Sequence, residues 1–189
     1  MTARRIGDWT QTYTGRQFWP LDPRPSEVSI IDIAHALSNQ CRFSGHSNTF
    51  YSVAQHSVIV SRLCPKTMAL TGLMHDASEA YLGDWIRPIK KLMLFNHCGG
   101  LVGASAIEDL VWQAICDRFG LIRKLPEDII RCDDVALVTE ARDIMGGQCR
   151  PWPSNAEPLP QRIVPVGPKD AEIAFLTRFI ELTDLESAP

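Results

Sequence analysis

Two histidines and several carboxylates occur at spacings that could place them together inside a helical protein. In the segment LMHDASEAYLGD, the side chains of His75, Asp76 and Glu79 fall within an arc of about 100° on a helix, beside the small residue Gly72. Burying such groups is costly unless they are paired or bind a metal ion. Imidazole and carboxylate groups suit a divalent transition ion such as Zn, Co, Mn or Fe, so the segment is a candidate metal site.

Two more residues could complete that site from other helices. His56 lies on the apolar stripe of Val53 and Val60, and Asp133 shares a face with Ile129 and with other apolar residues. Periodicity does not separate Asp133 from its neighbour Asp134. A lone histidine on an apolar face is usually a satisfied core residue, and a lone aspartate is usually solvated, but the joint pattern favours a metal centre.

The elements that must position these residues are mostly helical. Apolar spacing and capping signals predict six helices: one that starts at Ser29, one over 52–63, one from Pro65 towards Tyr81, one from a capping box at Ser105–Glu108 to Gly120, one over 126–145, and one that starts near Pro168. Burying His56 requires that these helices pack around it. We therefore expect an all-α bundle.

Three segments fall outside the helices. Residues 10–19 have strand-prone residues on both sides of Thr14-Gly15 and predict a small N-terminal β hairpin. Residues 82–103 are rich in glycine and could form a lid or site loop. The proline-rich residues 146–168 predict an extended excursion that could return to the hairpin through 162–166. The whole chain, 1–189, is expected to form a single domain.

Composition narrows the class of protein. The chain has 189 residues, 45% of them apolar, and its 19 Lys+Arg against 22 Asp+Glu give a net charge of −3. This balance argues against a protein that coats duplex nucleic acid, which needs many unopposed cations. No apolar run is long enough for a membrane span, and none follows Arg4 and Arg5 as in a signal peptide, so we expect a cytoplasmic protein.

The pattern His56…His75-Asp76…Asp133 resembles the HD-domain metal-dependent phosphohydrolases. The surrounding text, SVAQHSV and HDASEAYLGDWIRPIKK, is similar to that of bacterial 5′-deoxynucleotidases and, more closely, of phage dATP triphosphohydrolases and their bacterial relatives. The likeness runs from about Tyr13 to residue 146. It implies an HD-domain fold that binds one transition ion.

The resemblance also assigns the acidic and metal-binding residues. His56, His75, Asp76 and Asp133 match the metal ligands. Asp133 is preferred over Asp134 because the family's ligand precedes the Glu of an EAR segment, here Glu140, by seven positions. That glutamate could equally pair with Arg142 or Arg131 on the surface. Two further carboxylates have counterparts, because Glu79 matches the catalytic carboxylate and Asp84 a second acidic site residue.

The substrate-binding residues follow from the same resemblance. Lys90, two residues beyond Pro88, matches a phosphate-contacting lysine, although a Lys-Lys pair is more often solvated. Arg42 matches an arginine that approaches phosphate and sugar. Phe43 stands where relatives often have tryptophan beside the sugar, and its alternative role is a core residue.

The implied reaction is hydrolysis of a nucleotide phosphate ester, in which metal-bound water attacks the α-phosphorus. The favoured substrate is a deoxynucleoside triphosphate such as dATP, which would give deoxynucleoside and tripolyphosphate with Mg on the polyphosphate tail. The alternatives are a 5′-deoxynucleotidase acting on dNMPs, a phosphodiesterase with the same metal site, and a non-catalytic nucleotide sensor. The relatives imply a homo-oligomer, and the apolar run Leu92–Phe95 would allow one.

Overall fold

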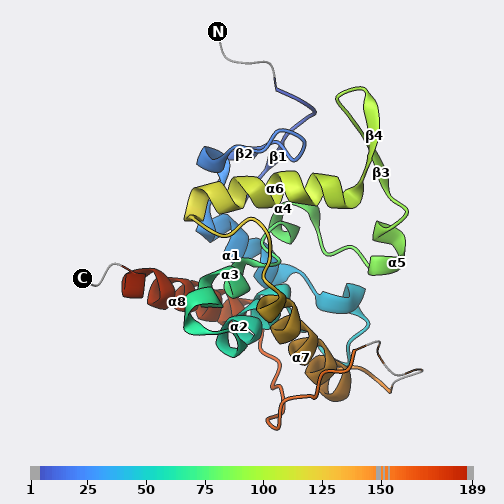
Figure 1. The fold of residues 1–189 in the computed structure, drawn as a ribbon, viewed down its shortest axis with the longest axis vertical. Helices are drawn as coiled ribbons and strands as arrows, with labels where there is room; N and C mark the ends of the chain where they lie inside the picture. Colours follow the sequence, from blue (N-terminus) through green and yellow to red (C-terminus); the bar gives the residue numbers. More distant parts are fainter. Residues whose placement is uncertain (1–4, 148–149, 151, 153, 187–189) are drawn as a thin grey trace.

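The computed structural model describes residues 5–147, 150, 152 and 154–186, and the chain is mostly helical with two small strand pairs (Figure 1). The helices are α1 (Ile30–Asn39), α2 (Val53–Leu63), α3 (Ala69–Met74), α4 (Glu79–Leu82), α5 (Arg87–Lys90), α6 (Ala104–Phe119), α7 (Glu127–Asp143) and α8 (Pro168–Glu186). Short 3₁₀ turns are η1 (Pro25–Glu27), η2 (Arg42–Gly45) and η3 (Lys66–Met68). Strand β1 (Thr10–Gln11) pairs antiparallel with β2 (Gln17–Phe18), and β3 (Leu94–His97) with β4 (Gly100–Gly103).

Helix α2 is the centre of the helical packing. It contacts α1, α3, α7 and α8, and the last of these also lies against α1. Small and branched side chains cover most of its circumference and are buried, as are two of its serines. Its start is the predicted capping box, because the Ser52 hydroxyl accepts a hydrogen bond from the Gln55 amide at 3.1 Å. A helix buried on most sides carries His56 into the interior.

Several helix predictions are confirmed to within a few residues. Helices α1, α2, α7 and α8 lie where apolar spacing places them. Helix α6 ends before Gly120, whose φ of 69° is the left-handed conformation that terminates helices at glycine. Its predicted start at a Ser105–Glu108 capping box is wrong, because β4 runs to Gly103 and the helix begins directly at Ala104.

The predicted helix from Pro65 to Tyr81 is interrupted. Helix α3 ends at Met74, residues 75–78 form a turn, and α4 begins at Glu79. The His75 ring nitrogen Nδ1 lies 2.9 Å from the Gly72 carbonyl oxygen. A side chain that bonds to this carbonyl competes with the helical backbone bond that the carbonyl would otherwise accept. His75 and Asp76 therefore project from a turn rather than from one face of a continuous helix.

The connection 82–103 is more ordered than a lid or site loop. It forms α5 and then the hairpin β3–β4, so the all-α expectation with one hairpin is wrong by a second strand pair. The hairpin turns at Cys98 and Gly99, whose φ values of 52° and 82° are both left-handed. Two such residues are typical of tight hairpins, but a cysteine is an unusual choice for the first of them, which hid the turn from sequence analysis.

The proline-rich excursion has neither helix nor strand over the described part of 146–167; residues 148, 149, 151 and 153 lie outside the described residues. Its predicted return to the N-terminal hairpin is wrong. The Gln55 side chain donates to the Val164 carbonyl at 2.8 Å and accepts from the Val166 amide at 3.0 Å. The segment is therefore bound to α2. Among the residues that the structure describes, no helix has both the length and the apolar character needed to cross a bilayer.

Candidate metal centre

Three of the predicted ligands converge on one point. His56 comes from α2, while His75 and Asp76 come from the turn between α3 and α4. The two Nε2 atoms are 3.3 Å apart, and Asp76 Oδ2 lies 3.5 Å from Nε2 of His56 and 3.2 Å from Nε2 of His75. Ligands at about 2.1 Å from a metal ion lie roughly 3.0–3.4 Å from one another in tetrahedral or octahedral geometry. The group could therefore hold a metal ion.

Asp133, on α7, approaches the same point from the other side of α2. Its Oδ1 atom is 3.1 Å from His56 Nε2 and 4.0 Å from His75 Nε2. Periodicity left Asp133 and Asp134 open, and Asp133 is the one that reaches the histidines. Burial alone would raise the pKa of Asp133, but its hydrogen bond to His56 and the nearby histidine charges lower the pKa. This favours the ionised form, which metal binding requires.

The other nitrogen of each histidine is occupied. Nδ1 of His56 lies 2.6 Å from Glu140 Oε1, and Nδ1 of His75 lies 2.9 Å from the Gly72 carbonyl. Both partners are acceptors, so each Nδ1 carries a proton and donates it. In the neutral rings, each Nε2 then presents a lone pair to the other histidine and to Asp76. A centre made of acceptors alone requires a cation or an additional proton.

The same neighbours determine which of these His56 attracts. Burial and the Arg42 guanidinium lower the pKa of His56, but the Glu140 and Asp133 carboxylates outweigh them and raise the pKa to about 9. Burial would raise the pKa of Asp76, whereas the charge and hydrogen bond of His75 hold the pKa far below its usual range. Both shifts describe a strongly negative pocket around the imidazoles, which a divalent cation would neutralise.

Glu140 is the principal residue of the site whose role the sequence did not predict. It is fully buried, and its Oε1 accepts from the Tyr51 hydroxyl at 2.9 Å as well as from His56. Its Oε2 accepts from Nε and Nη2 of Arg42 at 3.3 and 3.1 Å. Burial alone would raise the pKa of Glu140, but Arg42 and His56 outweigh it and lower the pKa. Glu140 is thus an ionised carboxylate that connects the metal-ligand group to an arginine.

A signal for this role was present in the sequence. Glu140 follows Asp133 by seven positions and shares its inward face, yet a surface pair with Arg142 or Arg131 seemed equally good. Those arginines pair instead with Asp143 and Asp128. Tyr51 gave no signal beyond its place before the α2 cap.

Arg42 lies beside the metal-ligand group, as predicted, but it is already engaged. Besides Glu140, its Nη1 atom lies 3.5 Å from Asp76 Oδ2. The Phe43 ring is half-buried, with its centroid 5.2 Å from the guanidinium carbon and 5.8 Å from the Trp152 ring in an edge-on arrangement. Phe43 therefore lies outside the buried core. Phe43 and Ser44 have φ values of 55° and 50°, a strained conformation that tends to occur at functional sites.

The two further acidic residues lie near the group. Glu79 begins α4, and its Oε2 atom is buried without a hydrogen-bond partner among the described residues. Burial, followed by the charges of Asp76 and Asp84, raises the pKa of Glu79 well above its ordinary value. Burial also raises the pKa of Asp84, opposed by Arg42 and increased by Asp76. A buried carboxyl with a raised pKa and a free oxygen is suited to exchange a proton.

The predicted phosphate contacts on α5 are less well placed. The Lys90 ammonium forms an ion pair with Glu108 of α6 at 2.6 Å, and Pro88 is exposed. Lys90 is still close enough to lower the pKa of Glu79 and Asp84 by its charge. It adds positive potential near the group, but in this structure its side chain is bound to another helix.

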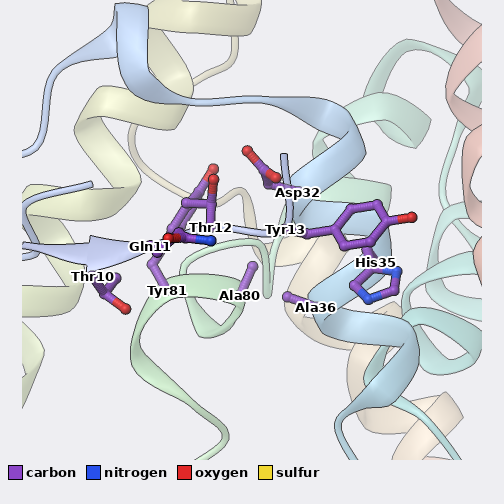
Figure 2. Close-up of a pocket in the computed structure, with 9 residues that line it drawn as sticks. All are labelled: Thr10, Gln11, Thr12, Tyr13, Asp32, His35, Ala36, Ala80 and Tyr81. Atoms are coloured by element: carbon purple, nitrogen blue, oxygen red, sulfur yellow. The ribbon is translucent and has the colours of Figure 1, made fainter. Parts of the chain in front are cut away.

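A separate cavity of about 360 Å³ lies between the N-terminal hairpin and helices α1 and α4 (Figure 2). The Tyr13 ring stacks on His35 there, with centroids 3.6 Å apart, and Asp32 accepts two hydrogen bonds from Thr14. None of the metal-ligand group lines this cavity, so it is not the proposed reaction site.

Comparisons with known proteins place the chain in a family. No family model matches the sequence. The chain is 35% identical over 179 residues to the uncharacterized protein YfdR of Escherichia coli K12, an alignment that covers 93% of this chain and 96% of YfdR. It is also 35% identical over 153 residues to an uncharacterized protein of Rhodobacter capsulatus, covering 73% of this chain and 74% of that protein. This level of identity over nearly the whole of both chains shows that the protein belongs to the family of E. coli YfdR.

Proposed function

We propose that the chain is a metal-dependent phosphohydrolase of the HD-domain type that hydrolyses nucleotide phosphate esters. The observation that carries the proposal is the convergence of His56, His75 and Asp76, with Asp133 beside them and each histidine Nδ1 held by an acceptor. Such outer hydrogen bonds orient imidazole ligands towards a metal. The donor set suits one divalent transition ion, Zn, Co, Mn or Fe.

A bound divalent ion would supply Lewis acidity and lower the pKa of a bound water. The protein's own groups would do the rest. Glu79, with one buried oxygen free of partners, would orient a water molecule or exchange a proton with it. Arg42, fixed by Glu140 and Asp76, would oppose charge developing on a phosphoryl oxygen. Lys90 would join it only by sharing or leaving Glu108.

The substrate we propose is a deoxynucleoside triphosphate such as dATP. Attack at the α-phosphorus would release deoxynucleoside and tripolyphosphate, with Mg on the phosphate tail. This preference rests on the resemblance of the text around His56 and His75 to phage dATP triphosphohydrolases. Hydrolysis of dNMPs by the same site is the alternative.

The test is a panel of ribo- and deoxynucleoside mono-, di- and triphosphates with Mn, Co, Zn, Fe or Mg, in which all products are resolved by chromatography. We expect deoxynucleoside and tripolyphosphate from a dNTP, and no turnover after treatment with a chelator. Phosphate release from dNMPs alone would indicate a 5′-deoxynucleotidase. Nucleotide binding without any product would overturn the hydrolase and leave a sensor.

A further inference from the structure

The hairpin β3–β4 is the most prominent projection of the described chain. It extends beyond the N-terminal end of α6, away from the bundle formed by α1, α2, α3 and α8 (Figure 1). Its pairing register places Leu94 opposite Gly103 and Asn96 opposite Leu101, so these residues share one face. Leu94 is 63% exposed and Leu101 71% exposed, and Leu92 just before the hairpin is 82% exposed. One face of the hairpin is therefore apolar and uncovered.

The opposite face of the hairpin is engaged within the chain. Phe95 pairs with Val102 across the strands, and its ring stacks on Trp85 with centroids 5.6 Å apart. Trp85 directly follows Asp84, one of the candidate site residues. The hairpin is thus held to the loop beside the candidate site by one face and presents the other to solvent.

The hairpin also lacks the features that keep sheet edges from pairing. Residues 92–107 contain no Asp, Glu, Lys, Arg or Pro. Natural edge strands that stay unpaired usually carry lysine, proline or other charged residues. A two-stranded sheet has two free edges, and a hairpin of this size is marginally stable without further packing.

We propose that the uncovered face and edges of β3–β4 form a contact with the same hairpin of a second copy of this chain. Antiparallel strands can pair with their own copies about a two-fold axis, so an identical hairpin is a complementary partner. At roughly 100 Å² for each large aliphatic side chain, Leu92, Leu94, Leu101 and the exposed Ile86 and Ile89 of the preceding segment offer on the order of 500 Å². That is a large part of the about 800 Å² that each partner buries in a standard interface.

The test measures molar mass in solution by light scattering for the full chain and two double variants. The first is Leu94→Lys/Leu101→Lys, which places charges on the free face and leaves the Phe95–Trp85 stack intact. The matched control is Ile173→Lys/Ile180→Lys on α8, where both isoleucines are more than half exposed. We expect the wild type and the α8 variant to be at least dimeric, and the hairpin variant to lose at least half of that mass.

A wild-type monomer, or loss of mass in the α8 variant but not in the hairpin variant, would overturn the proposal. Circular dichroism verifies that the variants keep their helices. If the lysine variant unfolds, Leu94→Thr/Leu101→Thr keeps strand propensity while removing apolar surface, and the same loss of mass is expected from it. The proposal does not depend on the catalytic function, because its readout is mass alone.

Discussion

Nδ1 of His56 and Oε1 of Glu140 lie 2.6 Å apart, both fully buried, and this contact determines which way the imidazole presents its other nitrogen. With the proton on Nδ1, the Nε2 lone pair faces His75, Asp76 and Asp133. The carboxylate that fixes the ring also holds Arg42. One glutamate therefore orients a candidate metal ligand and a candidate phosphate-binding cation.

The first prediction concerns this glutamate. Glu140→Gln keeps the size of the side chain but removes the charge, so we expect metal affinity to fall by roughly 10–100-fold, the usual effect of losing an outer-shell partner. Titration with Mn or Co followed by calorimetry measures it. Glu157→Gln, on the exposed proline-rich segment, is the matched control. Unchanged affinity in Glu140→Gln would show that Glu140 only supports the fold.

The second prediction separates chemistry from metal binding. Glu79→Ala should keep the ion, because Glu79 is not among the converging donors, while turnover should fall by roughly 10²–10⁴-fold. Metal content and the rate of product formation are measured on the same preparation. If Glu79→Ala loses its metal, Glu79 is a ligand and the proposed proton role is wrong.

The third prediction concerns sugar selectivity. Phe43 presents an apolar ring that cannot accept or donate a hydrogen bond to a 2′-hydroxyl, and an unpaired buried hydroxyl costs about 1–3 kcal/mol, or roughly 5- to 150-fold in preference. We expect wild type to prefer dATP over ATP and Phe43→Ala to lose most of that preference.

Phe43→Gly is the companion variant, since glycine accepts a φ of 55° without strain. If the ring determines selectivity, both variants lower the ratio of dATP to ATP turnover equally. An unchanged ratio in both would mean that selectivity lies elsewhere.

The fourth prediction concerns acid stability. The Arg142 hydrogen bond, against the effect of desolvation and helped by the Ile163 amide, lowers the pKa of Asp143 from 3.8 to about 2. Since the pKa is lower in the folded state, this interaction stabilises the fold above pH 3.8, and the contribution is lost as pH falls towards 2. We expect Asp143→Asn to lower the free energy of unfolding at neutral pH by about 2 kcal/mol.

Urea unfolding between neutral pH and pH 2 measures this effect, with Asp109→Asn on the exposed side of α6 as the control. The difference between Asp143→Asn and wild type should shrink towards zero at the acid end. A difference that does not change with pH would show that charge is not the cause.

The sequence was informative where one helix face decides burial. The stripe of Val53 and Val60 correctly predicted that His56 points inward, and the Ser52 capping box correctly placed the start of α2. It was less informative where side chains compete with the backbone. The His75 bond to the Gly72 carbonyl ends α3 early, a contact that helical periodicity does not describe.

Long-range polar pairing was the second limit. Glu140 had arginines nearby in sequence, and its actual partner, Arg42, lies 98 positions away. The distinction depends on how α7 packs beside α2, which spacing along one helix cannot provide. The hairpin β3–β4 was missed for a local reason, because its turn uses Cys98 in a conformation that glycine or asparagine usually adopts.

The central claim is that His56, His75 and Asp76, with Asp133, hold a metal ion, and elemental analysis of the purified protein tests it most directly. Wild type should contain about one transition ion per chain, and His75→Ala should lose most of it. His46→Ala, on the exposed 3₁₀ segment, should retain the wild-type content. Undiminished metal in His75→Ala, or none in wild type after exposure to Zn, Co, Mn and Fe, would contradict the account.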